Sequence, residues 1–125
     1  MVSPTGTYDQ ATARNLGLLS EREQSRLQGA HVAIAGMGAV GGHYLMALAR
    51  LGVGGFTVAD PDSFEVANLQ RQAGAFAHTL GRNKAAAMAE MARGVNAGVR
   101  IRVLGAPVCG DNVDFFLENA DLVLD

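Results

Sequence analysis

Cysteine, long apolar runs and lysine are scarce in this sequence of 125 residues. Its only cysteine is Cys109, which excludes an intramolecular disulfide and a four-thiolate zinc site and fits a reducing cytoplasm. The longest mostly apolar run, Val32 to Gly42, is far shorter than the roughly 18 residues that a membrane-spanning helix requires. The start of the sequence does not resemble a signal peptide. We therefore expect a cytoplasmic protein without a membrane segment.

An excess of positive charge is also missing. Ten Lys and Arg residues stand against twelve Asp and Glu, which gives a net charge of −2. Binding to duplex nucleic acid through its phosphates needs a basic surface, so this class of partner is disfavoured. Hydrophobic residues make up 49% and charged residues 18% of the chain, which excludes disorder as its main state. The length fits one domain or part of one.

The apolar residues alternate between strand-like and helix-like patterns. Continuous apolar runs are typical of strands buried in a parallel sheet, and apolar residues three and four positions apart indicate helices. The predicted strands are 31–36, 55–60, 99–104 and 121–125, and the predicted helices are 20–27, 40–51, 79–95 and 113–119. Asp111 is the expected N-cap of the last helix. Strands alternating with helices favour an α/β fold, a Rossmann-like, doubly wound and mostly parallel sheet.

The two ends of this pattern differ from the rest. Residues 1–12 mix Ser, Pro, Thr and Gly without periodicity and are predicted to form a flexible arm. The third predicted strand alternates apolar residues with arginine, which indicates a position nearer an edge of the sheet. Residues 63–78 are predicted to form a long, partly irregular polar connection.

Three glycines follow the first predicted strand with the spacing G-x-G-x-x-G. Gly36 permits a tight turn, Gly38 lets backbone N–H groups approach a phosphate, and Gly41 lets the next helix pack on the strand. Asp60 ends the second predicted strand and is placed to accept hydrogen bonds from ribose hydroxyls. Glycines alone could simply form a tight turn. The strand, helix and acid around them together predict a nucleotide site.

Polar and cationic residues follow at positions that suit a larger anion. A nucleoside triphosphate carries more charge than a helix N-terminus neutralises, so its site normally includes Lys or Arg and a metal ion. Asn68, Arg71 and Gln72 lie in the polar connection, and Lys84, the only lysine, lies in the first turn of the next helix. A cation there is unfavourable for the helix dipole, which indicates that Lys84 faces an anion. The alternative is a solvated lysine and a surface arginine.

The order of these segments resembles the ThiF and MoeB adenylating family, whose eukaryotic relatives activate ubiquitin and ubiquitin-like proteins. The segments that carry the resemblance are 14–15, 36–42, 59–62, 68–72, 81–84 and 121–125. The resemblance implies a ThiF-type nucleotide-binding domain over residues 20–125, preceded by an N-terminal arm, 1–19, that contributes Arg14. Members of this family continue past the last of these segments. We therefore expect this chain to be the N-terminal part of a larger adenylation domain.

The resemblance also implies a reaction and its participants. The reaction is ATP-dependent adenylation of a carboxylate, with Mg²⁺ as a second cofactor. The acceptor would be the C-terminus of a ubiquitin-like or sulfur-carrier protein, or a related small acceptor. Asp60 would hold the ribose, Asp125 would help place Mg²⁺, and Arg14 would reach the phosphates of the neighbouring protomer, which implies a homodimer.

The implied site residues fall into two groups. The nucleotide would be bound by Gly36, Gly38, Gly41, Asp60, Asn68, Arg71, Gln72 and Lys84. The groups acting in the reaction would be Arg14, Arg71, Lys84 and Asp125. Two alternatives stay open: an NAD-binding oxidoreductase, which would leave the cations without a task, and a catalytically silent nucleotide-binding or dimerisation module.

Overall fold

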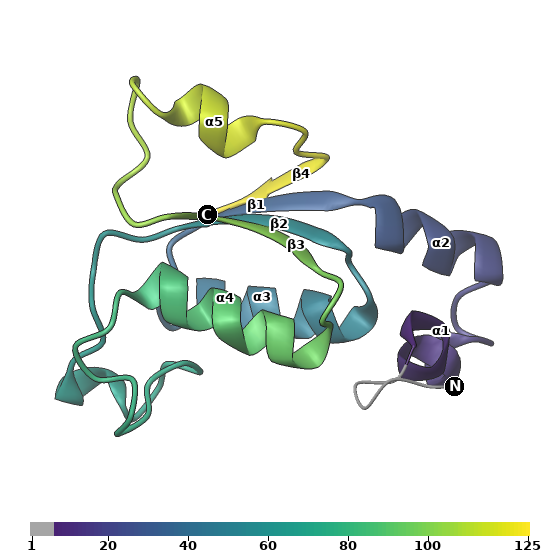
Figure 1. The fold of residues 1–125 in the computed structure, drawn as a ribbon, viewed down its shortest axis with the longest axis horizontal. Coiled ribbons are helices and arrows are strands. Elements are labelled where there is room, and N and C mark those ends of the chain that lie inside the picture. Colours follow the sequence, from purple (N-terminus) through teal and green to yellow (C-terminus); the bar gives the residue numbers. More distant parts are fainter. Residues whose placement is uncertain (1–6) are drawn as a thin grey trace.

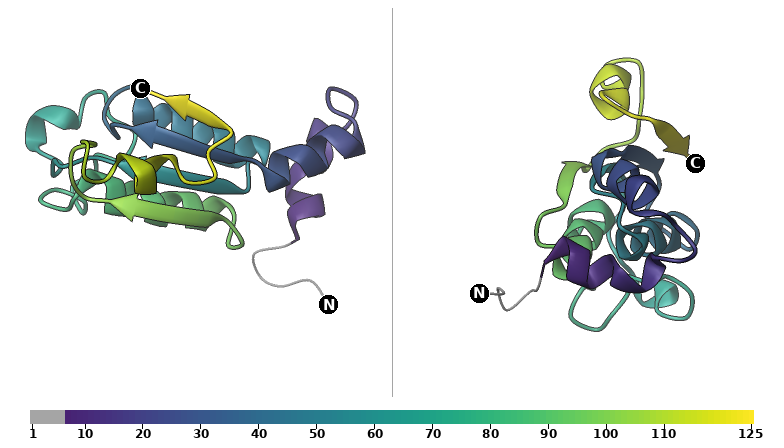
Figure 2. Two further views of the ribbon diagram at one scale, coloured as in Figure 1. Left: turned by 90° about the horizontal axis from the view of Figure 1, so that it is seen from above. Right: turned by 90° about the vertical axis from the view of Figure 1, so that its right-hand side faces the viewer.

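Four parallel strands form one sheet in the computed structural model, which describes residues 7–125 (Figure 1). The strands are β1 (His31–Ala35), β2 (Gly55–Ala59), β3 (Arg100–Leu104) and β4 (Leu122–Leu124). Their order across the sheet is β3-β2-β1-β4. Figure 2 shows this order from above, with β3 and β4 at the two edges, so the predicted edge position of the third strand is confirmed.

Helices cover both faces of this sheet, as a doubly wound fold requires. The helices are α1 (Tyr8–Thr12), α2 (Glu21–Gly29), α3 (Gly41–Leu51), α4 (Lys84–Val95) and α5 (Val113–Leu117), with 3₁₀ turns η1 (Ala13–Asn15) and η2 (Val66–Asn68). In Figure 1, α3 and α4 lie side by side under one face, and α5 lies over the other. The predicted fold class is therefore confirmed. No helix among residues 7–125 is long and apolar enough to span a membrane.

The core lies mainly between the sheet and the pair α3 and α4. Val32 and Ile34 of β1 point into this layer, with Phe56 of β2, Leu45 of α3 and Met88 of α4. The intervening strand residues face α5, because successive side chains of a strand point to opposite faces. There Ala33 and Ala59 pack with Phe116 in a smaller cluster. Burial on both faces explains why β1 and β2 are continuous apolar runs.

The strand order places a topological switch between β1 and β4. From β1 the chain proceeds through β2 to β3 on one side of the sheet, and it then returns over the opposite face to β4. In such sheets, ligands bind in the crevice outside the carboxyl ends of the strands at the switch. The turn that holds the three glycines follows β1 directly, so it borders this crevice.

The N-terminal segment differs from the prediction. Residues 8–12 form helix α1 and not a flexible arm, and a capping box between Thr7 and Gln10 begins the helix. Such a short helix carries no apolar period, so the pattern could not indicate it. Residues 1–6 of the predicted arm lie outside the described residues.

Two other boundaries also need correction. Helix α4 begins at Lys84, not at Thr79, because the Asn83 side chain accepts a hydrogen bond from the Ala86 N–H and caps the helix there. Asp111 does not cap α5, whose N-cap is Asn112. The capping box of α2 at Ser20 and the closure of α3 at Gly52 are confirmed.

Candidate nucleotide site

The first and third glycines fix the turn between β1 and α3. Gly36 has φ +91°, a conformation that favours glycine, and its N–H donates to the Ala59 carbonyl at 2.7 Å. A Cβ atom on Gly41 would lie 1.7 Å from the Gly36 carbonyl oxygen. No side chain fits there, so the start of α3 packs directly on the turn. The roles predicted for these two glycines agree with this geometry.

Asp60 supports the turn from the end of β2. The residue is 6% exposed, and its carboxylate accepts the Met37 N–H through Oδ2 and the Asp62 N–H through Oδ1, both at 2.8 Å. Each oxygen keeps lone-pair capacity for another donor. The structure therefore gives Asp60 a role that the sequence did not indicate, as a brace for the residue after Gly36.

The next backbone donors of the turn remain available. Among the described residues, the N–H groups of Gly38, Ala39, Val40 and Gly41 have no hydrogen-bond acceptor. Unpaired N–H groups at a helix N-terminus carry partial positive charge and bind anions. Residues 36–37 of the turn are therefore fixed by hydrogen bonds, and the N–H groups of the residues that follow are free to bind an anion.

Gln72 lies over the part of the turn whose N–H groups are free. A Cβ on Gly38 would be 3.5 Å from Gln72 Nε2. The Gln72 side chain is buried, and its Oε1 is the one buried side-chain oxygen or nitrogen without a partner in the described residues. A buried polar atom without a partner is costly, and it marks a place where a ligand or water completes the hydrogen bonding.

Asn68 holds the segment that carries Gln72. Its Oδ1 accepts the Glu65 N–H at 2.8 Å, and its carbonyl accepts the N–H groups of Arg71 and Gln72 at 3.2 and 3.0 Å. Asn68 is 7% exposed. The structure therefore shows Asn68 as a residue that shapes η2 and orients Gln72. An amide oxygen cannot donate a hydrogen bond, so Oδ1 cannot make the phosphate contact that the sequence predicted for Asn68.

Lys84 is a largely buried residue at the first position of α4. The residue is 8% exposed, and its ammonium nitrogen lies 5.8 Å from the centroid of the Phe64 ring. No carboxylate in residues 7–125 forms an ion pair with it. The ammonium nitrogen itself is not among the fully buried atoms, so a ligand can reach it. Aromatic contact stabilises the charge in part, and a bound anion would complete its pairing.

Packing contacts connect Lys84 with the glycine turn. Met88 lies one helical turn beyond Lys84, and its Cε is 3.5 Å from the Cβ position of Gly42 in the first turn of α3. Phe64, beneath the ammonium, also lies against Gly74, two residues after Gln72. Lys84 and Gln72 therefore stand on segments that pack around the same turn.

Asn83 is a site residue that sequence reasoning missed. Its Nδ2 donates to the Asp60 carbonyl at 2.9 Å, and the Lys84 N–H donates to the Asp62 carbonyl at 2.8 Å. These bonds tie the start of α4 to the end of β2. An asparagine before a run of strong helix formers was a recognisable capping signal. Phe64 had no signal in the sequence.

The guanidinium of Arg71 does not enter the site in this structure. Nη1 donates to the Ala67 carbonyl at 2.9 Å within the same turn, and the residue is exposed. Its backbone, however, is next to α3, since the Arg71 carbonyl lies 3.4 Å from His43 Nε2. The structure thus brings the Arg71 backbone to the first turn of α3 and leaves the guanidinium outside the candidate nucleotide site.

Arg14 lies at the opposite end of the sheet from the glycine turn. The next residue, Asn15, donates to the Leu51 carbonyl in the last turn of α3. The eleven residues of α3 span about 16 Å at 1.5 Å per residue. An arginine side chain does not cover this distance, so Arg14 cannot reach the turn of its own chain.

Asp125 lies at the β1–β4 crevice. Ile34 pairs with Leu124, and the parallel register therefore places Asp125 beside Ala35, one residue before Gly36. No three His, Cys, Asp or Glu side chains within residues 7–125 are grouped to hold a metal ion. Magnesium bound with a nucleotide takes one or two carboxylates plus phosphate oxygens and water. A single exposed carboxylate at this edge is compatible with that mode of binding.

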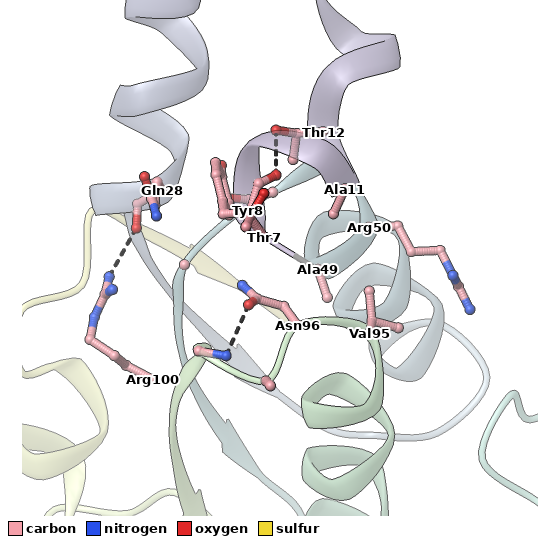
Figure 3. Close-up of a pocket in the computed structure, with 14 residues that line it drawn as sticks. Thr7, Tyr8, Ala11, Thr12, Gln28, Ala49, Arg50, Val95, Asn96 and Arg100 are labelled. Atoms are coloured by element: carbon pink, nitrogen blue, oxygen red, sulfur yellow. Dashed lines mark hydrogen bonds between the residues drawn. The ribbon is translucent and has the colours of Figure 1, made fainter. Parts of the chain in front are cut away.

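A cleft of about 540 Å³ lies elsewhere, at the end of the sheet where the strands begin. Figure 3 shows it between α1, the last turns of α3 and α4, and the start of β3, with Tyr8, Asn96 and Arg100 around it. It contains none of the predicted site residues. Its size therefore does not identify it as the nucleotide site.

The sequence matches the ThiF family over residues 11–125. It is 38% identical over 96 residues to tRNA threonylcarbamoyladenosine dehydratase of Escherichia coli, and this match covers 77% of this chain and 36% of the relative. It is 35% identical over 102 residues to SAMP-activating enzyme E1 of Haloferax volcanii, and this match covers 82% of this chain and 38% of that enzyme.

Solved structures agree with these sequence matches. The crystal structure of the E. coli dehydratase TcdA in complex with ATP superposes with a TM-score of 0.84 at 32% identity, over 94% of this chain and 47% of that one. This chain therefore spans less than half the length of each of these relatives.

Proposed function

Because the chain belongs to the ThiF family, we propose that it binds ATP over the glycine turn and takes part in the transfer of AMP to a carboxylate. Relatives that are adenylating enzymes support this proposal. One is sulfur carrier protein ThiS adenylyltransferase of Bacillus subtilis, which is 33% identical over 82% of this chain and 31% of that protein. The crystal structure of TcdA with ATP adds a relative of the same fold that binds this nucleotide.

The observation that carries the proposal is Lys84, a residue only 8% exposed whose ammonium has no acidic partner among residues 7–125. An NAD-type dinucleotide brings two phosphate charges, which a helix N-terminus largely neutralises. A triphosphate brings close to four and needs a cation near the turn. Lys84 supplies this cation, and the Gln72 side chain, whose Oε1 has no partner, adds a polar group beside Gly38.

Each predicted residue has a task in this arrangement. Asp60 accepts from the ribose with lone pairs that the backbone donors leave unused. Lys84 and the open N–H groups of the turn hold phosphates. Asn68 contributes its amide nitrogen or acts through Gln72. Arg71 joins the phosphates by exchanging the Ala67 carbonyl for a phosphate oxygen, which forms a stronger, charge-assisted hydrogen bond.

The reaction needs no nucleophilic side chain of the protein. A carboxylate oxygen of the acceptor attacks the α-phosphorus, the bond to the bridging oxygen breaks, and pyrophosphate leaves. Negative charge grows on the phosphoryl oxygens and on the leaving group, and the cations lower the barrier by stabilising that charge. Bound Mg²⁺ would supply further charge neutralisation, and Asp125 is the residue that would hold it.

A second copy of the chain completes this proposal. Arg14 cannot reach the turn of its own chain, so a homodimer in which it reaches the neighbouring site gives this residue its role. Residues 1–19 are then an arm that presents Arg14, and residues 20–125 are the nucleotide-binding unit. The acceptor is the C-terminus of a ubiquitin-like or sulfur-carrier protein, or a related small acceptor.

Isothermal titration with MgATP and with NAD tests the ligand. We expect MgATP to bind more tightly, and Lys84→Ala to weaken MgATP at least about tenfold, because a contact between charged groups contributes roughly 1.5–3 kcal/mol. Arg93→Ala is the matched control, since this exposed cation lies in the last turn of the same helix. Equal affinities for the two nucleotides would favour the oxidoreductase alternative.

The reaction requires a separate experiment on the full-length protein. ATP–pyrophosphate exchange should appear when a sulfur-carrier protein or another candidate carboxylate is added, and it should be absent without an acceptor. Exchange with none of the candidates, combined with tight MgATP binding, would favour a catalytically silent nucleotide-binding module.

A further inference from the structure

Three polar side chains from the N-terminal segments form one hydrogen-bond network against the end of α3. Gln24 of α2 is 5% exposed. Its Oε1 accepts from Asn15 Nδ2 at 2.9 Å, and its Nε2 donates to the Tyr8 hydroxyl at 2.8 Å and to the Leu51 carbonyl at 3.0 Å. Asn15 Nδ2 also donates to that carbonyl at 3.0 Å, and the Tyr8 hydroxyl donates to the Gly52 carbonyl at 2.6 Å.

The backbone of α3 is shaped to admit this network. Gly52 has φ +111°, and a Cβ on it would lie 2.3 Å from Gln24 Nε2 and 2.5 Å from the Tyr8 hydroxyl oxygen. Any larger residue would displace both side chains. The last carbonyls of a helix need partners from outside the helix, and here Gln24, Tyr8 and Asn15 provide them. The network therefore joins α1, η1 and α2 to one end of α3.

Arg14 lies within the part of the backbone that this network holds. Asn15 fixes the chain directly after it, and Tyr8 and Thr12 fix it before, since the Thr12 hydroxyl donates to the Tyr8 carbonyl at 2.9 Å. Figure 3 shows Tyr8 and Thr12 where α1 meets the end of α3, near Ala49. Arg14 itself is exposed. An anchored backbone thus carries a cation that is open to solvent.

We infer that Gln24, with Tyr8 and Asn15, is a positioning residue that holds Arg14 ready for the nucleotide of a second copy. This inference rests on the proposed function, in which Arg14 acts across a dimer. A side chain that is ordered only on binding loses conformational entropy, and an anchored backbone reduces this loss. Helix α3 begins at the nucleotide turn and ends at the hydrogen-bond network of Gln24, so it connects these two parts of the chain.

The test measures MgATP binding by purified dimers of the full-length protein, assembled from two differently tagged variants. Gln24→Leu removes the central amide, Arg14→Ala removes the presented charge, and Lys84→Ala damages the receiving site. We expect each variant alone to bind MgATP at least about tenfold more weakly than the unmodified protein. Gln28→Leu, the same change one turn later on α2 at an exposed position, should bind normally.

Mixed dimers separate positioning of Arg14 from general damage. A dimer of Lys84→Ala and Gln24→Leu should regain one site of normal affinity, because the Gln24→Leu chain keeps its lysine and receives Arg14 from its partner. A dimer of Arg14→Ala and Gln24→Leu should regain none. Loss of recovery in the first pair, recovery in the second, or normal binding by Gln24→Leu alone would overturn the inference.

A further pair keeps this outcome distinct from failure of the proposed function. A mixed dimer of Lys84→Ala and Arg14→Ala should regain one normal site whether or not Gln24 has a role. If it does not, or if the unmodified protein binds no MgATP, the proposed function itself is wrong. If Gln24→Leu does not fold, Tyr8→Phe removes only one hydroxyl of the network and is expected to give the same pattern of recovery.

Discussion

Replacing Gly41 by alanine should unfold the nucleotide turn, and replacing its neighbour Gly42 should not. A Cβ on Gly41 would lie 1.7 Å from the Gly36 carbonyl oxygen and 2.7 Å from its carbon, which are backbone atoms. A Cβ on Gly42 would have its nearest neighbours at 3.4 and 3.5 Å, which is ordinary contact. The two positions are adjacent in the first turn of α3, so they form a matched pair.

The size of the effect follows from how firmly the Gly36 carbonyl is held. Gly36 is fixed by its N–H bond to Ala59 and by the Asp60 brace on the next residue. Relief of the overlap therefore has to move the start of α3 away from the sheet. Overpacking in a tight core costs roughly 1–3 kcal/mol or more, whereas alanine in place of glycine in a helix gains up to about 1 kcal/mol. Both variants share any gain in helix propensity, so we expect Gly41→Ala to be less stable than Gly42→Ala by the cost of the overlap, about 1–3 kcal/mol.

Urea unfolding followed by circular dichroism measures this difference. Titration with MgATP on the same samples should show that Gly42→Ala keeps its affinity and Gly41→Ala loses it. Unfolding midpoints that coincide for the two variants would mean that the turn can shift without cost. In that case the close contact between Gly41 and Gly36 does not fix the site.

Two further predictions concern His31 at the start of β1 and Asp60 after the end of β2. Burial and the nearby Arg102 and Arg100 lower the pKa of His31 below its ordinary value of 6.5, against the opposing effect of Asp121 and Glu118. The unfolded chain therefore binds more protons than the folded one, so stability should fall as pH drops below about 6.5 toward the lowered pKa. His31→Gln should reduce this part of the pH dependence in urea unfolding, and an unchanged slope would contradict the assignment. Asp60→Asn should cost about 1–3 kcal/mol, because one backbone N–H then faces an amide N–H₂ group, and an unchanged urea midpoint would show that the brace is not needed.

The sequence predicted those parts of the site that depend on short-range geometry. The Gly36 turn follows a buried strand and precedes a helix, and each of these features has a local cause. Glycine alone tolerates the positive φ, and Gly52 in the left-handed conformation ends the helix where the apolar spacing ends. Lys84 in the first turn of α4 was also predicted, although the helix starts five residues later than expected.

The missed features depend on contacts between distant residues. The start of α4 is fixed by Asn83, whose amide reaches the Asp60 carbonyl 23 positions earlier in the chain. The Asp60 brace on Met37 spans the same separation, and the Phe64 ring meets the Lys84 ammonium only because both segments pack around the turn. No local pattern carries such information, since each residue is ordinary in its own segment.

The contrast between Lys84 and Arg14 shows what the fold adds. In the sequence Lys84 is the more distant from the glycines, and Arg14 precedes Gly36 by only 22 positions. In the structure Lys84 packs around the turn through Met88, and Arg14 is separated from it by the length of α3. The same helix that exposes its N-terminal donors to an anion therefore keeps the arginine of its own chain away from that anion. Any contact between Arg14 and a bound nucleotide must consequently join two molecules, so it depends on protein concentration. Weakening of MgATP binding on dilution, reduced in Arg14→Ala, follows from this geometry.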